Sequence, residues 1–233
     1  MPENSPNGKL ILLATPLGNL GEFPPRAVEV LKTADKILCE NTPSALRLMT
    51  VFGITGKTVR AVHEANEGAA AESVAREVSE GQMIVYMSEA GAPCISDPGF
   101  RLVRACRRIN LRVEAIGISS AFLNALIISG LPTDEFFFCG FPPPKSVGRK
   151  KFFEARCSKN IEATVIFYES CHRLLSSISD LKEIVGPERF VCLAGELTKL
   201  HESVQTAPVG GLKLPENPKG EWVVCVAKEG YRL

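Results

Sequence analysis

Short hydrophobic runs alternate with amphipathic stretches along the first half of the chain. Their periodicity predicts strands over residues 9–15, 36–40, 59–63, 83–88 and 112–117. Helix start signals follow several of these runs, because Pro24-Pro25, Thr42-Pro43 and Asp97-Pro98 predict helices over 26–33, 44–52 and 99–109. Strands that alternate with helices in this way are typical of a largely parallel sheet.

The pattern changes after an apolar helix predicted over 119–129, where Gly130-Leu-Pro-Thr-Asp134 interrupts it. The second half is richer in strands, predicted over 135–141, 163–169, 189–197 and 221–227, and has one strong helix pattern over 170–185. We expect the connection between the halves around residues 117–120. The fold class is therefore α/β, with an amino-terminal α/β domain over 8–117 and a carboxy-terminal α+β domain with a mixed sheet over 118–230.

The composition indicates which kinds of partner the chain could bind. A chain of 233 residues that is 45 % hydrophobic can bury a sizeable core. Its net charge of +1 gives no global attraction to nucleic acid, so such a partner would need a local basic patch. The sequence has neither a signal-peptide pattern nor an apolar run near the ~18 residues that cross a bilayer, and we expect no membrane association.

The eight cysteines are scattered, form no C-x-x-C pair and lie mostly in apolar runs, where thiols act as small hydrophobic groups. His63 and His201 have no partner at metal-ligand spacing. We therefore expect no metal site and no disulfide framework, and a reducing, cytoplasmic setting.

Three loops of small residues follow predicted strands, at residues 15–19, 88–93 and 117–121. Parallel strands place such loops at one edge of a sheet, and glycine and serine let a ligand approach the backbone. None is G-x-G-x-x-G or G-x-x-x-x-G-K-[ST], which excludes the dinucleotide and Walker phosphate motifs. Each alone could be a plain connection, but together they predict an adenosine-sized pocket between the two domains.

Polar residues gather at two predicted strand ends of the second half: Glu169, His172 and Arg173 at one, Glu196 and Lys199 at the other. They could form one catalytic cluster. Alternatively, His172 and Arg173 pack on the first turn of their own helix, and Glu196 and Lys199 form a solvated pair. The sequence leaves both interpretations open.

Two basic clusters could contact phosphates. The denser one, predicted to be a mobile loop after Phe141-Pro-Pro-Pro144, has the candidate RNA-binding residues Lys145, Arg149, Lys150 and Lys151. The second lies on the helix predicted over 99–109, with Arg101, Arg104, Arg107 and Arg108. The alternative is that each cluster is an ordinary solvated surface.

Several longer motifs occur in a fixed order along the chain. They are Ala14-Thr-Pro-Leu-Gly-Asn-Leu20, Ser88-Glu-Ala-Gly-Ala-Pro-Cys-Ile-Ser-Asp-Pro-Gly99, Gly130-Leu-Pro132, Gly140-Phe-Pro-Pro-Pro-Lys145, Phe167-Tyr-Glu-Ser-Cys-His-Arg173, Glu196-Leu-Thr-Lys199, Ala207-Pro-Val-Gly210 and Gly220-Glu-Trp222. In this order they resemble the tetrapyrrole-methylase-like, class III S-adenosylmethionine methyltransferases. The closest resemblance is to the branch of ribosomal RNA small-subunit methyltransferase I.

The resemblance implies a two-domain fold with S-adenosylmethionine in the cleft, usually a homodimer. It implies 2′-O-methylation of a cytidine in the RNA of the small ribosomal subunit. Carried over by position, it implies cofactor contacts from Leu17, Gly18, Ser88, Glu89, Gly91, Pro93, Ser119, Ser120 and the backbone near Phe167, Ala194 and Trp222.

The chain departs from the family pattern at several motifs. It has Glu40-Asn-Thr-Pro43 for Glu-Asp-Thr-Arg, Glu89-Ala-Gly-Ala-Pro93 for Asp-Ala-Gly-Thr-Pro, Ile116-Gly-Ile118 for Pro-Gly-Pro, and Gly195 for an arginine. The carboxy-terminal extension common in the rRNA enzymes has no counterpart after Leu233. Two alternatives therefore stay open: a methylase of the same fold with a small-molecule or protein acceptor, and a cofactor-binding protein that has lost catalysis.

Methyl transfer from a sulfonium to an oxygen is an in-line displacement, so the protein mainly aligns the acceptor with the cofactor. A ribose hydroxyl is a poor nucleophile while protonated. We hypothesise that Glu196 or Glu169 is the base, with Lys199 or Arg173 as its electrostatic partner.

Overall fold

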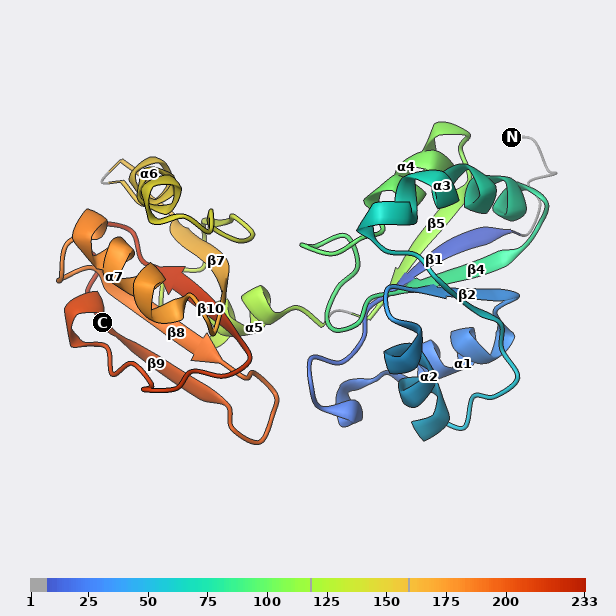
Figure 1. The fold of residues 1–233 in the computed structure, drawn as a ribbon, viewed down its shortest axis with the longest axis horizontal. Helices are drawn as coiled ribbons and strands as arrows, with labels where there is room; N and C mark the ends of the chain where they lie inside the picture. Colours follow the sequence, from blue (N-terminus) through green and yellow to red (C-terminus); the bar gives the residue numbers. More distant parts are fainter. Residues whose placement is uncertain (1–7, 118, 159) are drawn as a thin grey trace. The chain divides into compact units, whose positions relative to one another are not determined.

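The computed structural model describes residues 8–117, 119–158 and 160–233. The chain divides after Ser119 into two compact units, at a point inside the connection expected around residues 117–120 (Figure 1).

The first unit contains a parallel five-stranded sheet. Its strands are β1 (Lys9–Leu13), β2 (Lys36–Cys39), β3 (Val59–Ala61), β4 (Met83–Met87) and β5 (Arg112–Ile116). Their order across the sheet is β3-β2-β4-β1-β5, and every neighbouring pair is parallel. The predicted parallel α/β sheet is confirmed, and its strands end one to two residues earlier than the periodicity predicted.

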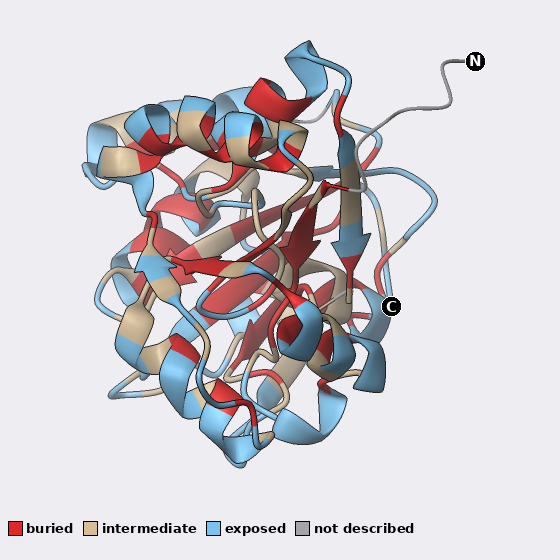
Figure 2. Cartoon of the chain, turned by 90° about the vertical axis from the view of Figure 1, so that its right-hand side faces the viewer, coloured by how far each residue is buried: buried red, intermediate tan, exposed pale blue. Residues whose placement is uncertain are grey.

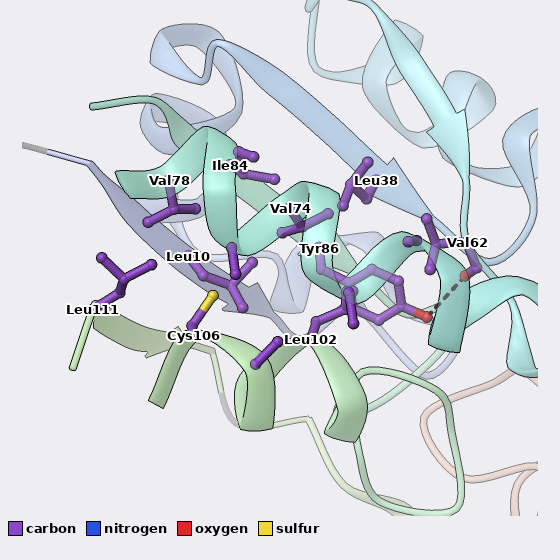
Figure 3. Close-up of a cluster of buried hydrophobic side chains, with 14 of the residues drawn as sticks. Leu10, Leu38, Val62, Val74, Val78, Ile84, Tyr86, Leu102, Cys106 and Leu111 are labelled. Atoms are coloured by element: carbon purple, nitrogen blue, oxygen red, sulfur yellow. Dashed lines mark hydrogen bonds between the residues drawn. The ribbon is translucent and has the colours of Figure 1, made fainter. Parts of the chain in front are cut away.

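Helices cover both faces of this sheet, which is why its strands are hydrophobic without strict alternation. On one face α3 (Glu64–Ser79) and α4 (Phe100–Arg108) pack on Leu10, Ile84 and Tyr86, as Figure 3 shows. On the other face α1 (Pro25–Thr33) and α2 (Thr42–Val51) pack on Ile11 and Val85. In Figure 2 the strands are largely buried, while the helices expose their outer sides. The sheet is therefore a rigid support for the loops at its edge.

The predicted start of the helix after β4 is wrong. Asp97 does not cap it, because α4 begins at Phe100 and its cap residue is Gly99, with a φ of 127°. The capping group comes from another helix: Oε1 of the buried Glu67 on α3 accepts from the Gly99 N–H at 2.8 Å and from the Arg101 N–H at 2.7 Å. A cap supplied from a distant part of the chain leaves no local sequence signal.

The second unit contains a mixed five-stranded sheet, as predicted. Its strands are β6 (Phe136–Phe138), β7 (Thr164–Ser170), β8 (Phe190–Gly195), β9 (Ser203–Pro208) and β10 (Glu221–Val226). The order is β6-β7-β10-β8-β9, with β6 parallel to β7 and the other neighbours antiparallel. The sequence analysis missed β9, an edge strand without a hydrophobic run whose residues are no more than half-buried.

The described part of this unit also contains the helices α5 (Ala121–Ile128), α6 (Ser146–Arg156) and α7 (Leu174–Val185). Single 3-10 turns lie at Leu20–Glu22 in the first unit and Val209–Gly211 here. α7 starts four residues later than predicted, because β7 continues to Ser170 and a turn follows it.

The mobile loop predicted over the basic segment 145–151 is wrong. The segment begins α6, whose buried side chains are Arg149 and Phe153. A buried arginine breaks the hydrophobic period of the helix, so periodicity alone could not reveal it.

Within the ranges that the structure describes, no helix is long and apolar enough to cross a membrane. Over the same ranges, no group of histidine, cysteine and acidic residues could hold a metal ion.

Candidate cofactor and acceptor site

The three predicted loops meet at the carboxyl edge of the first sheet. β1 lies between β4 and β5, so the loops after these strands are neighbours. Thr15 and Gly91 exchange backbone hydrogen bonds of 3.0 Å in both directions, and the Ala14 N–H donates to the Ile116 carbonyl at 2.9 Å. Residues that are distant in sequence are thus tied into one surface, as the parallel topology predicted.

Buried hydroxyl groups hold the loop after β4. The Ser88 hydroxyl donates to the Gly91 carbonyl at 2.6 Å, and the Thr15 hydroxyl donates to the Ser88 carbonyl at 3.2 Å. Ser88 is almost fully buried. Its side chain therefore fixes the loop, and the backbone around it is what the loop can offer to a ligand.

Gly91 lets the three loops approach one another. Its φ is 80°, a conformation that side chains rarely adopt, and a Cβ there would lie 3.3 Å from Leu17 Cδ2 and 3.5 Å from the Ser119 carbonyl oxygen. Leu17, Gly91 and Ser119 were all predicted to contact the cofactor, one from each loop. The structure brings these three positions together around the glycine.

Two buried polar atoms follow this surface in the chain. The hydroxyl groups of Ser119 and Ser120 are buried and have no hydrogen-bond partner among the described residues. A buried hydroxyl without a partner costs about 1–3 kcal/mol, so a ligand that supplies the partner gains affinity there. The hydroxyl and amino groups of S-adenosylmethionine can supply such partners, and these residues therefore fit the cofactor.

A pocket of ≈ 240 Å³ lies in the first unit beside these loops. Its walls come from the loop after β1, including Gly18, from Ser88 and Glu89 after β4, and from α2. On the α2 wall Arg47 Nη2 donates to Ser44 Oγ at 2.9 Å, and this hydroxyl donates to Glu89 Oε1 at 2.7 Å.

The sequence analysis missed the contribution of α2 to this pocket. Ser44 and Arg47 were placed on a helix but in no site. The sequence did show that this helix begins just after a predicted strand. In the structure that strand, β2, is the neighbour of β4. Adjacent parallel strands place their following elements at one edge.

Carboxylates also gather at this edge. Burial raises the pKa of Glu40 above its usual value, the negative charge of Glu89 raises it further, and His63 opposes the shift. Glu40 begins the motif that departs from the expected Glu-Asp-Thr-Arg, and here Asn41 caps α2 by accepting from the Ser44 N–H at 3.1 Å. The altered motif is therefore still a helix start.

In the second unit, the predicted polar residues also share a sheet edge. β10 runs antiparallel to β7 and β8, and Trp222 pairs with Glu169 on one side and Gly195 on the other. A Cβ at Gly195 would lie 2.6 Å from the indole ring of Trp222. The position where the family has an arginine is thus occupied by the face of this tryptophan.

Glu169 is fully buried at this edge. Its Oε1 accepts from Arg173 Nη2 at 2.7 Å and from the Ser170 N–H at 2.9 Å, while Oε2 is buried with no partner among the described residues. Arg173 also donates to the Pro142 carbonyl at 3.3 Å. The structure therefore joins Glu169 and Arg173 in one network and fixes the end of β7.

Glu196 and Lys199 form the second pair. Lys199 Nζ lies 2.9 Å from Glu196 Oε1, and the two side chains are 42 % and 24 % exposed, respectively, so the pair is open to solvent. A Cβ at Gly220 would lie 1.7 Å from Glu196 Oε1, which shows how closely the carboxylate crosses that glycine. The nearby Thr198 hydroxyl, which sequence reasoning missed, is buried and without a partner among the described residues.

The other residues considered in the sequence analysis differ in exposure. Phe167 and Ala194 are fully buried, so only their backbone could contact a cofactor, as the resemblance implied. His172 is exposed, and His63 lies at the start of α3. Pro93 is half-buried in the loop after β4.

Two of the four candidate RNA-binding residues, Arg149 and Lys150, are paired with acidic residues of α7. Arg149 is buried, and its Nε donates to Asp180 Oδ2 at 2.8 Å; Lys150 Nζ lies 2.6 Å from Glu183 Oε2. Lys145 and Lys151 are exposed. Arg149 is therefore a buried ion-pair partner of α7 and cannot offer a surface charge to a phosphate.

The sequence family is decided by a match over most of the chain. The family model described as Tetrapyrrole (Corrin/Porphyrin) Methylases matches residues 9–213. The chain belongs to the tetrapyrrole methylase family. This methylase is 43 % identical to "Ribosomal RNA small subunit methyltransferase I" of Escherichia coli O157:H7, over 97 % of its own length and 79 % of that relative. It is 41 % identical to the protein of the same name from Synechocystis, over 94 % of this chain and 79 % of that relative.

Solved structures agree on the fold of the methylase. A diphthine synthase superposes with a TM-score of 0.70 at 13 % identity, covering 94 % of this chain and 89 % of that one. A uroporphyrin-III-C-methyltransferase from Thermus thermophilus superposes with a TM-score of 0.63 at 19 % identity, covering 95 % of this chain and 94 % of that one. Family and relatives together make the chain a methyltransferase that uses S-adenosylmethionine.

Proposed function

We propose that this methylase transfers the methyl group of S-adenosylmethionine to the 2′-hydroxyl of a cytidine in the RNA of the small ribosomal subunit. Relatives that share one rRNA methyltransferase name over 94–97 % of the chain support this acceptor. The observation that carries the cofactor assignment is the junction at Gly91, where Leu17 and Ser119 approach the same glycine.

The cofactor would be held mainly by backbone groups of the loops after β1, β4 and β5. Gly18 and Glu89 line the pocket, and Leu17, Gly91 and Pro93 belong to the same loops. The buried hydroxyls of Ser119 and Ser120, which have no partner among the described residues, would donate to or accept from the cofactor's polar groups. When bound, S-adenosylmethionine supplies an electrophilic methyl group on a sulfonium.

The acceptor would be activated at the edge formed by β7, β8 and β10. The Glu196 carboxylate would take the proton of the ribose hydroxyl, so that the oxygen could accept the methyl group that the bound cofactor would supply. Lys199, paired with Glu196, stabilises the negative charge that develops on the oxygen. Partial exposure of Glu196 favours it as the base over Glu169, whose carboxylate is fully buried.

The test is transfer of a labelled methyl group from S-adenosylmethionine to purified small ribosomal subunits that lack the modification. We expect incorporation at a cytidine 2′-oxygen, and loss of both calorimetric cofactor binding and transfer in Gly91→Arg, whose side chain fills the loop junction. Transfer to a base or to a protein would contradict the acceptor. Binding without transfer to subunit or RNA would favour a protein that has lost catalysis.

The cellular setting is also a proposal. We propose a reducing cytoplasm, because all eight cysteines are free and five of them are buried. Burial raises the pKa of Cys106 to about 11 and that of Cys157 to about 12, so both thiols stay protonated and unreactive. Cell fractionation would test this setting.

A further inference from the structure

The basic cluster on α4 has a very different environment from the one on α6. From Pro98 to Val113 the chain contains arginines but no aspartate or glutamate. The side chains of Leu102 and Cys106 point into the core between α4 and α3, as Figure 3 shows. Arg101, Arg104, Arg107 and Arg108 are exposed on the other side of the helix, and we call these four residues the arginine face.

The spacing of the arginine face concentrates its charge. Arg104 and Arg108 lie four residues apart, and Arg101 three residues before Arg104, so the three guanidinium groups follow one stripe of the helix. Like charges at this spacing destabilise a free helix by a few tenths of a kcal/mol per pair, so the helix itself gains nothing from them.

Three of the four charges of the arginine face have no ion-pair partner in the part of the chain that the structure describes. Among the described residues, Arg104, Arg107 and Arg108 form no ion pair; Arg107 donates only to the Val113 carbonyl at 3.4 Å. The exposed Glu64 and Glu72 on the neighbouring α3 also form no ion pair with them. By contrast, Arg149 and Lys150 on α6 are paired with acidic residues of α7.

Apolar groups border the arginine face. Phe100 at the start of α4 is 62 % exposed, and Ile109 just after its end is 56 % exposed. Exposed aromatic rings beside guanidinium groups are the combination that single-stranded RNA contacts, through stacking on bases and charge on phosphates. A second copy of the chain is a poor occupant, because it would bring two arginine faces together.

The arginine face is also connected to the candidate cofactor loop, through the chain and through hydrogen bonds. α4 follows directly on the loop that begins at Ser88, and the buried Glu67 holds Gly99 and Arg101 at the junction. Phosphate contacts fix the position of a nucleic acid without reading its sequence. An RNA held here would therefore be positioned relative to the loop after β4.

We propose that the arginine face of α4 binds the phosphate backbone of the acceptor RNA. This inference rests on the proposed function and names the surface that the RNA uses. The overall charge of the chain is only +1, so this unpaired local charge supplies the attraction that the whole molecule lacks.

The test compares three double variants of equal charge change. Arg104→Glu/Arg108→Glu removes the arginine face, Lys145→Glu/Lys151→Glu removes the exposed lysines near the start of α6, and Lys32→Glu/Arg76→Glu is the control on exposed positions of α1 and α3. The probe is a fluorescent transcript of small-subunit ribosomal RNA, measured by anisotropy over a series of KCl concentrations. Calorimetry with S-adenosylmethionine and thermal unfolding report on folding of each variant.

We expect the α4 variant to bind the transcript at least about tenfold more weakly, and to lower the salt slope by about 1.5, since each lost phosphate contact removes about 0.7–0.9. Cofactor binding should match that of the wild type. The control should keep both properties. Arg104→Gln/Arg108→Gln removes the two positive charges without adding negative charges that would repel phosphates. It should also weaken RNA binding, but by less than the glutamate variant.

Other outcomes overturn the inference. RNA affinity that is unchanged in both α4 variants, or lost only in the α6 variant, places the RNA elsewhere. A changed molecular mass of the α4 variant would instead make this face a contact between copies. A wild type that binds the transcript tightly but transfers no methyl to small subunits would contradict the proposed function while leaving the surface intact.

Discussion

At the scale of single residues, Gly91 and Gly195 allow close packing at the edges of the two sheets. At Gly91 a positive φ and close neighbours bring three loops together. At Gly195, where the family resemblance led us to expect an arginine, the missing side chain leaves room for the ring of Trp222. The charge that the arginine carries is not replaced, and Lys199 is the nearby cation that the proposed chemistry uses.

Replacing Glu196 by Gln tests the proposed base. Removal of a general base lowers turnover by about 10²-fold or more, whereas the site that we propose holds the cofactor mainly by the loops of the first unit. We expect kcat to fall by about this factor with an unchanged KM for S-adenosylmethionine, and a flattened acidic limb of the pH–rate profile. Glu216→Gln, an exposed position of the same unit, should behave as wild type. Unchanged turnover in Glu196→Gln would transfer the role to Glu169.

Glu40 gives a prediction about pH. Its pKa is raised in the folded protein, so ionising it costs folding free energy as pH rises above the value of about 4.5 that holds in the unfolded chain. Below that pH the carboxyl is neutral in both states. Glu40→Gln should therefore unfold a few °C above wild type at pH 7 and at the same temperature near pH 4.

The control for this pH effect is Glu29→Gln, an exposed position on α1. Calorimetric unfolding at both pH values compares the three proteins. If Glu40→Gln raised the unfolding temperature equally at pH 4 and pH 7, packing and not charge would be the cause of the difference in stability.

At the scale of elements, α4 depends on α3. The Glu67 carboxylate supplies the hydrogen bonds that the first N–H groups of α4 need, and it is buried, so water cannot replace it. We expect Glu67→Ala to lower the free energy of unfolding by about 2–4 kcal/mol, because the buried Gly99 N–H and the partly buried Arg101 N–H lose their acceptor. Urea unfolding measures this, and Glu72→Ala on the exposed side of α3 should change it by less than about 0.5 kcal/mol.

This variant also separates two roles of Glu67. If the residue only stabilises the fold, Glu67→Ala will keep wild-type cofactor affinity at low temperature, where it is still folded. If it also positions the loop after β4, cofactor affinity will fall there and Glu67→Gln, which keeps one acceptor oxygen, will restore part of it. A loss of less than about 1 kcal/mol in urea would contradict the capping role.

Element prediction succeeded where the signal was local. The parallel strands of the first unit follow from the side-chain period, and Pro43 marks the first turn of α2, which begins at Thr42, two residues before its predicted start. It failed for α6 and β9, because one buries an arginine and the other is a half-exposed edge strand. In both, a distant partner, α7 or β8, stabilises the element.

At the scale of the whole molecule, each unit has its own sheet and buried core. We propose that the protein is a homodimer, following the resemblance to its family. Light scattering of the purified protein should give twice the mass of one chain. The mass should not change between low and high salt if burial of apolar surface holds the copies together. A single-chain mass at micromolar concentration would contradict this.

The sequence by itself determined the fold class, the loops at strand ends and the family, because these depend on residue period and on motifs that are contiguous in the chain. Only the tertiary structure decided which charges are available. It paired Arg149 with Asp180, left Arg104 and Arg108 without an ion-pair partner among the described residues, and gave α4 its cap from Glu67. The physical reason is that ion pairs and caps join residues far apart in the chain, and their partners are set by topology, which no local pattern records.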